Sequence, residues 1–263
     1  TAGNSGIQYR SIDRGDWKIS GYQADISADG RWTGTNYHEH GRAILAKRGQ
    51  KVVVGDGRGN VEVLGSLGDA EELLAKIKPN DWNEYRIVAH GRRLIQEING
   101  TVMSDVLDKG EKDFLRSGVL ALQIHSGPPM KVQFKDIHLK RLALADGEKK
   151  VVLVAGRKSH GFGSHEHRAG CMLLAKQLNA NAPKVVATVY SGGWPKDPTA
   201  FDNANSIVMY MDGGGRHPIN KHLAEMGALM KKGIGLVCLH YAVEVPKGES
   251  GDRMLDWTGG YFE

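Results

Sequence analysis

The segment 151–170, VVLVAGRKSHGFGSHEHRAG, constrains the fold of this chain more than any other. It opens with an apolar run of strand length, 151–155, and continues into a loop rich in glycine and histidine. An amphipathic stretch follows, which we expect to be a helix from about 166 to 178. Strand, loop and helix in this order begin a βαβ unit, so the second half of the chain is predicted to be an α/β domain. Ligands of such domains bind beyond the carboxyl ends of the strands.

The rest of the second half continues this alternation. Further strands are predicted at 184–189, 206–211 and 234–239. A helix is predicted after Pro218, which suits a first turn. Apolar residues recur there at helical spacing, at Ile219, Leu223, Met226 and Met230. Parallel strands joined by helices predict a doubly wound sheet.

Polar side chains follow three of these predicted strands, and parallel strands bring such residues to one edge of the sheet. The set comprises His160, His165, His167, Asp212, His217, His240, Tyr241 and Glu244. Imidazole and carboxylate suit zinc and similar ions, so a divalent metal is a possible cofactor. No diagnostic metal spacing is present, and the glycine-rich loops match neither GxGxxG nor a P-loop. A polar pocket that binds a ligand by hydrogen bonds and scattered surface histidines stay open as alternatives.

The first half shows period-2 alternation interrupted by turn signals. Strands are predicted at 7–12, 19–27, 43–47, 52–54, 61–64, 85–89, 94–98, 101–105, 119–125 and 131–142. Asn99-Gly100 predicts a hairpin, and Asp69 is placed to cap a helix over 69–76. Many short strands with regular turns favour a β-sandwich or jelly roll. The chain as a whole is thus predicted to be multidomain, β followed by α/β.

Alternation also predicts which side chains share a face. Three strands each carry a polar pair on one side: Gln8 with Arg10, Gln23 with Asp25, and Gln123 with His125. A sheet face rich in hydrogen-bonding groups suits a hydroxyl-rich ligand. The alternative is a solvated face, which antiparallel sheets commonly have.

Five ordered segments of the first half resemble one known family. They are NSGIQYRS (4–11), GYQADI (21–26), GRAILAKRG (41–49), WNEYRIVAHGRRLIQEINGT (82–101) and GVLALQIHSGPPMKVQFKDIHLKRL (118–142). The family they resemble is the 3-keto-disaccharide hydrolase domain. The resemblance implies a concanavalin-like jelly roll that acts on or binds sugars, including glycosides oxidised at C3. Domains of this family begin with strands ahead of NSGI, so we expect this one to be truncated at its start.

This resemblance also implies which residues face the sugar. They are Asn4, Gln8, Arg10, Tyr22, Gln23, Asp25, Tyr37, Glu39, Arg42, Gln123 and His125. Asp25, Glu39 and His125 are the ionisable members and therefore the catalytic candidates. A 3-keto group acidifies the neighbouring C–H, so elimination across C1–C2 followed by hydration would cleave the glycoside. That route needs a base and an acid rather than two flanking carboxylates. We predict His125 as the base; a surface loop histidine is the alternative.

The second half carries the segments VVLVAGRKSHGFGSHEHRAG, SIVMYMDGGGRHP, GIGLVCLHYAVE and LDWTGGYFE. These resemble the ThuA-like (trehalose-utilisation) family, which implies a flavodoxin-like fold related to class I glutamine amidotransferases. His240 stands where the amidotransferase nucleophile would be, and Cys238 lies inside the preceding strand. Because a thiolate is the nucleophile in such sites, we expect the amidotransferase reaction to be lost. Further strands are expected after residue 263, so this domain also reads as truncated.

A short polar segment, 143–150, separates the two patterns and predicts domains over 1–145 and 149–263. The net charge is +5, but Lys and Arg are scattered, so no nucleic-acid partner is predicted. Apolar runs fall short of the ~20 residues that span a bilayer, so no membrane span is predicted. No signal peptide is present; we nevertheless expect a periplasmic or secreted location. The sequence does not predict an oligomeric state.

Together the two resemblances predict an enzyme that acts on carbohydrates, a glycoside hydrolase or lyase whose substrates are disaccharides or glycosides, including 3-keto-glycosides. Two competing interpretations remain. In the first, the jelly roll binds glycan without catalysis. In the second, the α/β domain is the enzyme and the jelly roll delivers its substrate.

Overall fold

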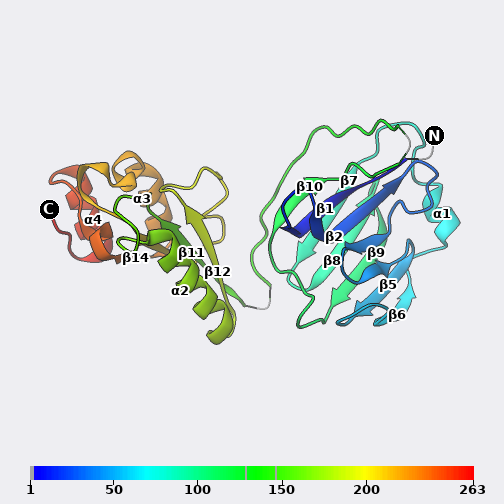
Figure 1. The fold of residues 1–263 in the computed structure, drawn as a ribbon, viewed down its shortest axis with the longest axis horizontal. Coiled ribbons are helices and arrows are strands. Elements are labelled where there is room, and N and C mark those ends of the chain that lie inside the picture. Colours follow the sequence, from blue (N-terminus) through cyan, green and yellow to red (C-terminus); the bar gives the residue numbers. More distant parts are fainter. Residues whose placement is uncertain (1–2, 128, 146) are drawn as a thin grey trace. The chain divides into compact units, whose positions relative to one another are not determined.

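The computed structural model describes residues 3–127, 129–145 and 147–263 (Figure 1). The chain forms two compact units, Thr1–His138 and Leu139–Glu263. This division lies just ahead of the polar segment 143–150 at which the sequence places the joint; Asp146, within that segment, is outside the described residues. Among the described residues, no helix is both long enough and apolar enough to cross a bilayer.

The first unit consists of two five-stranded sheets. One sheet is antiparallel, with the order β10-β1-β2-β3-β4. The other has the order β6-β5-β9-β8-β7 and contains one parallel pair, β5 with β9. The strands are β1 (Asn4–Asp13), β2 (Ile19–Ser27), β3 (Asn36–Glu39), β4 (Ala43–Ala46), β5 (Gln50–Val54), β6 (Val61–Ser66), β7 (Tyr85–His90), β8 (Arg93–Ile98), β9 (Thr101–Asp108) and β10 (Val119–Leu122).

The two sheets enclose one apolar core, as strand alternation requires. Tyr9 and Tyr22 stack at 5.6 Å on the inner face of the first sheet, and Val52, Leu94 and Val106 of the second sheet join the same core. This β-sandwich is consistent with the predicted jelly roll. Two local predictions are confirmed: Asp69 accepts hydrogen bonds as N-cap of helix α1 (Ala70–Leu74), and a tight turn at Asn99-Gly100, with φ of 51° and 76°, joins β8 to β9.

One predicted strand is absent, and one observed strand was not predicted. The segment 131–142 forms no strand, although its apolar residues alternate, and the side chains of Ile137 and Leu139 are 69% and 57% exposed. A strand requires a neighbour for its backbone groups, and this segment does not join the sheet edge at β10. Conversely, the short strand β3 was not expected, because its sequence, NYHE, has no apolar run.

A buried ion pair ties the two sheets of the first unit together. The guanidinium of Arg42, between β3 and β4, makes two hydrogen bonds to the Asp108 carboxylate on β9, and both side chains are almost fully buried. The hydroxyl of Tyr22 donates to the same carboxylate. His38 completes the group by accepting from Arg42 Nε. Burial, together with the positive charge of Arg42, lowers the pKa of His38 to about 4, so this imidazole is neutral near pH 7.

Replacing Arg42 by methionine is expected to lower the free energy of unfolding by about 3–5 kcal/mol, because the Asp108 charge would stay buried without its partner. Arg86→Met is the matched control: Arg86 pairs with Glu97 on the surface, and its loss should cost less than about 1 kcal/mol. Urea unfolding measures both. An equal, small effect of the two substitutions would show that the buried pair does not stabilise the sandwich.

The second unit contains a four-stranded parallel sheet with the order β12-β11-β13-β14. Its strands are β11 (Lys149–Ala155), β12 (Val185–Ser191), β13 (Ser206–Tyr210) and β14 (Gly235–Leu239). Its helices are α2 (His167–Asn181), α3 (Leu223–Lys231) and α4 (Glu249–Thr258), with short 3-10 turns η1 (Gly214–Arg216), η2 (Pro218–Lys221) and η3 (His240–Val243).

Helices pack on both faces of this sheet. Cys171 and Ala175 of α2 contact Leu153 on one face. Met226 of α3 and Met254 of α4 belong to the core on the other face. Alternate residues of a strand point to opposite faces: Val152 and Val154 of β11 belong to one core, and Leu153 and Ala155 to the other. From residue 151 onward β11 is therefore apolar, as a strand covered on both faces must be. The predicted doubly wound arrangement of a parallel sheet is therefore present.

Candidate functional site

The outer face of the antiparallel sheet in the first unit carries a row of amide and carboxyl groups. Register places Gln8 opposite Gln23, and Gln23 opposite Tyr37. The Gln8 amide donates to Gln23 Oε1 at 2.8 Å, and the Gln23 amide donates to Asp25 Oδ1 at 2.5 Å. Gln23 also donates to Gln123 Oε1 at 3.4 Å. Residues of β1 and β2 and the chain after β10 thus form one network on the face opposite the core.

Asp25 is the buried carboxyl group of this network. Burial raises its pKa to about 6, with the Gln23 hydrogen bond acting in the opposite direction. The charge of Glu39 raises this pKa further, and that of His125 lowers it, so both groups lie within electrostatic reach of Asp25. The three predicted catalytic residues therefore form one coupled group. A carboxyl group of this pKa exchanges its proton close to neutral pH.

Three other predicted residues of this face, Asn4, Tyr37 and His125, are less buried than Asp25. Asn4 pairs with Ser27 at one end of the sheet and is half-buried. Tyr37 is half-buried, and burial together with the nearby Glu39 raises the pKa of its hydroxyl. His125 is exposed, and its Nδ1 is 2.6 Å from the Ser126 carbonyl oxygen, to which it donates.

Three residues expected to face the sugar lie elsewhere. Tyr22 is fully buried in the core and Arg42 is 3% exposed; both serve the Asp108 ion pair described above. The Arg10 guanidinium donates to the carbonyls of Ala89 and Gly91 at the β7 end of the facing sheet. A bulge in β1 between Tyr9 and Ile12, where Arg10 has φ of 48°, interrupts the alternation that would place Arg10 beside Gln8.

Asp25→Asn is expected to stabilise the protein at neutral pH. The folded pKa of about 6 lies above the unfolded value of 3.8, so the native state holds its proton more tightly and loses stability as pH rises through 4 to 6. The amide avoids this penalty, which should give a gain of about 1–3 kcal/mol at pH 8.

The gain should vanish at pH 4, where Asp25 is itself protonated, and thermal unfolding at both pH values measures it. Asp29→Asn is the control, because Asp29 is exposed, and it should give no gain at either pH. A gain for Asp25→Asn that is independent of pH would contradict the assignment.

The second candidate site lies at the carboxyl ends of the parallel strands in the second unit. β11 and β13 are neighbours in the sheet, yet the chain leaves β11 through α2 and leaves β13 toward α3, which cover opposite faces. This is the switch point at which open α/β sheets bind ligands. His160 and His165 follow β11, Asp212 follows β13, and His240 follows β14. These four residues therefore lie together at one edge of the parallel sheet, as predicted.

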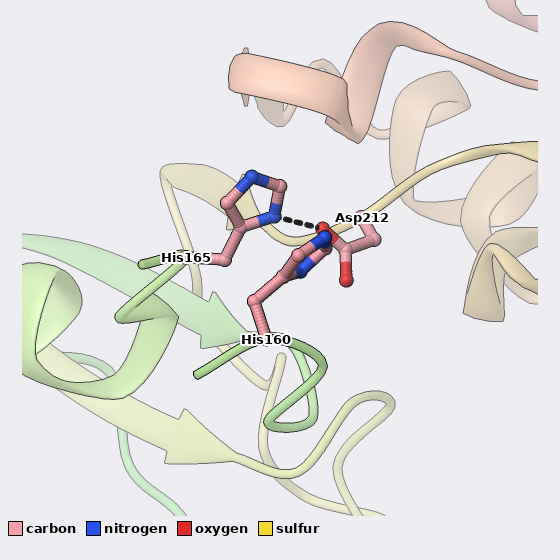
Figure 2. Close-up of side chains that lie close together, drawn as sticks. All are labelled: His160, His165 and Asp212. Atoms are coloured by element: carbon pink, nitrogen blue, oxygen red, sulfur yellow. Dashed lines mark hydrogen bonds and ion pairs between the residues drawn. The ribbon is translucent and has the colours of Figure 1, made fainter. Parts of the chain in front are cut away.

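His160, His165 and Asp212 lie side by side in Figure 2, with one potential ligand atom of each within 4.8 Å of the others. His165 Nδ1 is 2.6 Å from Asp212 Oδ1, the bond drawn in Figure 2. The rings of His160 and His165 are 3.8 Å apart. His240 Nε2 is 3.4 Å from His165 Nε2. Partial burial acts to raise the pKa of Asp212, but hydrogen bonds from Ser159 and His165 lower it overall.

His167, at the start of α2, borders this cluster from the buried side. Its Nδ1 is 3.2 Å from the Arg157 carbonyl, which can only accept, so Nδ1 carries a proton. Its Nε2 is buried, has no hydrogen-bond partner among the residues that the structure describes, and lies 3.5 Å from Asp212 Oδ1. Tyr241 lies at the exposed side, with its ring 4.2 Å from that of His240.

Two predicted members of this pocket have other roles. His217 is buried, accepts a hydrogen bond from the Ile219 amide as N-cap of η2, and bonds through Nε2 to the Ala242 carbonyl. Burial lowers its pKa to about 4. Glu244 accepts a backbone hydrogen bond from Gly214 and pairs with Phe262 in an isolated bridge. Both therefore hold the loops beside the cluster.

The sequence did not single out two neighbours of the cluster. Ser159 Oγ lies 2.8 Å from His160 Nδ1, and the Tyr210 ring stands edge-on to His167 at 5.0 Å. Ser159 could have been identified because it adjoins His160, and Tyr210 because it is the last residue of β13. Cys238 is inside β14 as predicted, and burial raises the pKa of its thiol to about 11. It is protonated at neutral pH and is not a thiolate nucleophile.

Comparison with known proteins bears on the first unit. The family model of the 3-keto-alpha-glucoside-1,2-lyase-like domain matches residues 1–140 of the 263. A search of curated proteins finds no match. The matched region contains both sheets of the sandwich and the whole network around Asp25. The chain thus belongs to the 3-keto-alpha-glucoside-1,2-lyase-like domain family.

Proposed function

We propose that the first unit cleaves glycosides that carry a ketone at C3, by elimination across C1–C2. The observation that carries this proposal is the buried Asp25, with a pKa of about 6, coupled to Glu39 and His125 on a sheet face lined with amides. The family description names a 1,2-lyase of 3-keto-alpha-glucosides, which agrees with the chemistry that such a group supports.

The reaction requires one proton to leave carbon and one to reach oxygen. A ketone at C3 acidifies the C2–H bond, so a base near neutral pKa can remove that proton. The electron pair of the C2–H bond forms the C1–C2 double bond, the C1–O bond breaks, and the departing oxygen takes a proton. Addition of water, with hydroxide to C1 and hydrogen to C2, then gives the free 3-keto sugar.

Asp25 is the base that we propose, in place of His125. Its pKa of about 6 leaves it mostly ionised at pH 7, while its buried carboxylate is poorly solvated and therefore readily takes a proton. His125 is exposed beside the network and suits the second role, protonation of the departing oxygen. The charge of Glu39 raises the pKa of Asp25.

The amides of this face would hold the sugar. Gln8 Oε1 is buried and has no hydrogen-bond partner among the described residues. Such an acceptor costs free energy unless a donor reaches it, and a sugar hydroxyl is a donor of the right kind. Gln23 and Gln123 present further amide groups along the same row.

For the second unit, the proposal is a ThuA-like domain of the same sugar metabolism. Its support is the four-stranded parallel sheet with helices on both faces and the resemblance of segments such as SIVMYMDGGGRHP. A domain of this kind would act on the same substrate or on its product.

Incubation of the purified chain with 3-keto-trehalose tests the proposal. We expect release of glucose, and Asp25→Asn should lower kcat by about 10²–10⁴-fold because it removes the base. In D₂O, the 3-keto-glucose formed should carry deuterium at C2, which direct hydrolysis of the C1–O bond would not introduce. Product incubated in D₂O without enzyme corrects for spontaneous exchange.

Three variants separate the competing interpretations. Loss of turnover with His125→Ala but not with Asp25→Asn would make His125 the base. Loss with His240→Ala alone would move the chemistry to the second unit. Binding of the keto sugar without turnover would make the sandwich a glycan-binding module. His138→Ala, at an exposed histidine outside the network, is the matched control.

A further inference from the structure

We propose that the second unit binds a divalent transition metal ion at the switch point of its sheet, with His160, His165 and Asp212 as ligands and His240 as a fourth donor. This site lies in the other unit from the sugar face and does not depend on the function proposed above. The inference follows from the distances among the four side chains, the position of the buried His167 Nε2 beside Asp212, and the place of the cluster in the fold.

The distances suit one small cation. Nitrogen and oxygen ligands lie about 2.0–2.2 Å from zinc, so two ligands of a tetrahedral ion are about 3.4 Å apart. The Nε2 atoms of His165 and His240 are already 3.4 Å apart. The ligand atoms of His160, His165 and Asp212 lie within 4.8 Å of one another. His160 is in an exposed loop, and a movement of about 1 Å would bring it to ligand distance.

Ring nitrogens and one carboxylate converge at this edge of the sheet. His165 Nδ1 is hydrogen-bonded to Asp212 Oδ1, and the Nε2 atom of the same ring lies 3.4 Å from His240 Nε2. Within the described part of the chain the buried Nε2 of His167 has no hydrogen-bond partner, and it lies 3.5 Å from the same carboxylate oxygen. Histidines that bind a metal through one nitrogen usually donate the other ring N–H to a carboxylate or carbonyl oxygen, and His165 with Asp212 has this arrangement. A cation bound here would have imidazole nitrogens and a carboxylate oxygen as ligands.

The backbone is shaped to present these side chains. His165 and His240 have φ of 50° and 58°, a left-handed conformation that residues with a Cβ rarely adopt. Such strain persists where the surroundings enforce it, and it clusters at functional sites. Here it turns two imidazoles from separate strand ends toward each other at the edge of the sheet.

The donor set indicates the class of metal. Imidazoles with one carboxylate favour zinc and neighbouring transition metals over magnesium or calcium, which prefer oxygen ligands. His160 and His240 are exposed, so one side of the ion would remain open to solvent.

Isothermal titration of the full chain, expressed without a histidine tag and treated with chelator, tests the site with Zn²⁺, Co²⁺ and Mg²⁺. We expect one equivalent of Zn²⁺ or Co²⁺ per chain, weak or absent Mg²⁺ binding, and visible Co²⁺ absorption of a site with nitrogen ligands. His160→Ala and Asp212→Asn should each weaken Zn²⁺ binding by at least about tenfold.

His138→Ala is the control and should leave binding unchanged, because this exposed histidine lies in the other unit. His160→Ala alters an exposed loop, so a fold defect is not expected to mimic ligand loss, and circular dichroism checks this. Absence of stoichiometric Zn²⁺ binding, or binding that survives both substitutions, would overturn the proposal. Neither readout uses turnover of a sugar, so the outcome is separate from that of the lyase proposal.

Discussion

The geometry of extended strands determines where polar chemistry lies in both units. In the sandwich, side chains alternate between two faces. Because β1 buries Tyr9 in the core it directs Gln8 outward, and because β2 buries Tyr22 it directs Gln23 outward. In the α/β unit, parallel strands end at one edge, so residues distant in sequence meet there. The first rule produces a row of amides around Asp25, and the second produces a cluster of imidazoles around Asp212. In each unit, the position of the site follows from how the strands pack to bury the core.

The two carboxylates illustrate how surroundings determine proton affinity. Burial raises the pKa of Asp25 to about 6, because a single amide hydrogen bond does not replace the lost solvation. For Asp212 the same desolvation is outweighed by hydrogen bonds from Ser159 and His165, and its pKa falls. One carboxyl group is thereby suited to exchange a proton near neutral pH and the other to remain an anion. Proton transfer in the first unit and cation binding in the second follow from this difference.

Much of this arrangement could be predicted from the sequence, because the long apolar patterns are unambiguous. β2 was predicted with its observed bounds, and the strand–loop–helix at 151–170 gave the parallel sheet and the position of His160 and His165. Predictions failed where the alternation of a strand is locally broken, or where the family resemblance placed a residue on the side of the sheet expected to face the sugar. A bulge at Arg10 turns its side chain away from the face that alternation predicts. Arg42 pairs with the carboxylate of Asp108, which is 66 residues away in the sequence. No local pattern could reveal either.

The histidines of the second unit show why residue type alone is a weak guide to a site. His217 and His165 both follow predicted strands, yet His217 bonds to two backbone groups and is withdrawn from the cluster. Burial there depresses its pKa to about 4, below the unfolded value of 6.5, so its contribution to stability is lost as pH falls between these values. A histidine whose two nitrogens are both bonded to the backbone has no capacity left for a ligand. His167 bonds to the backbone through Nδ1 alone, and its Nε2 has no hydrogen-bond partner among the described residues and lies 3.5 Å from Asp212. This free nitrogen distinguishes an imidazole that borders the cluster from one that only supports the backbone.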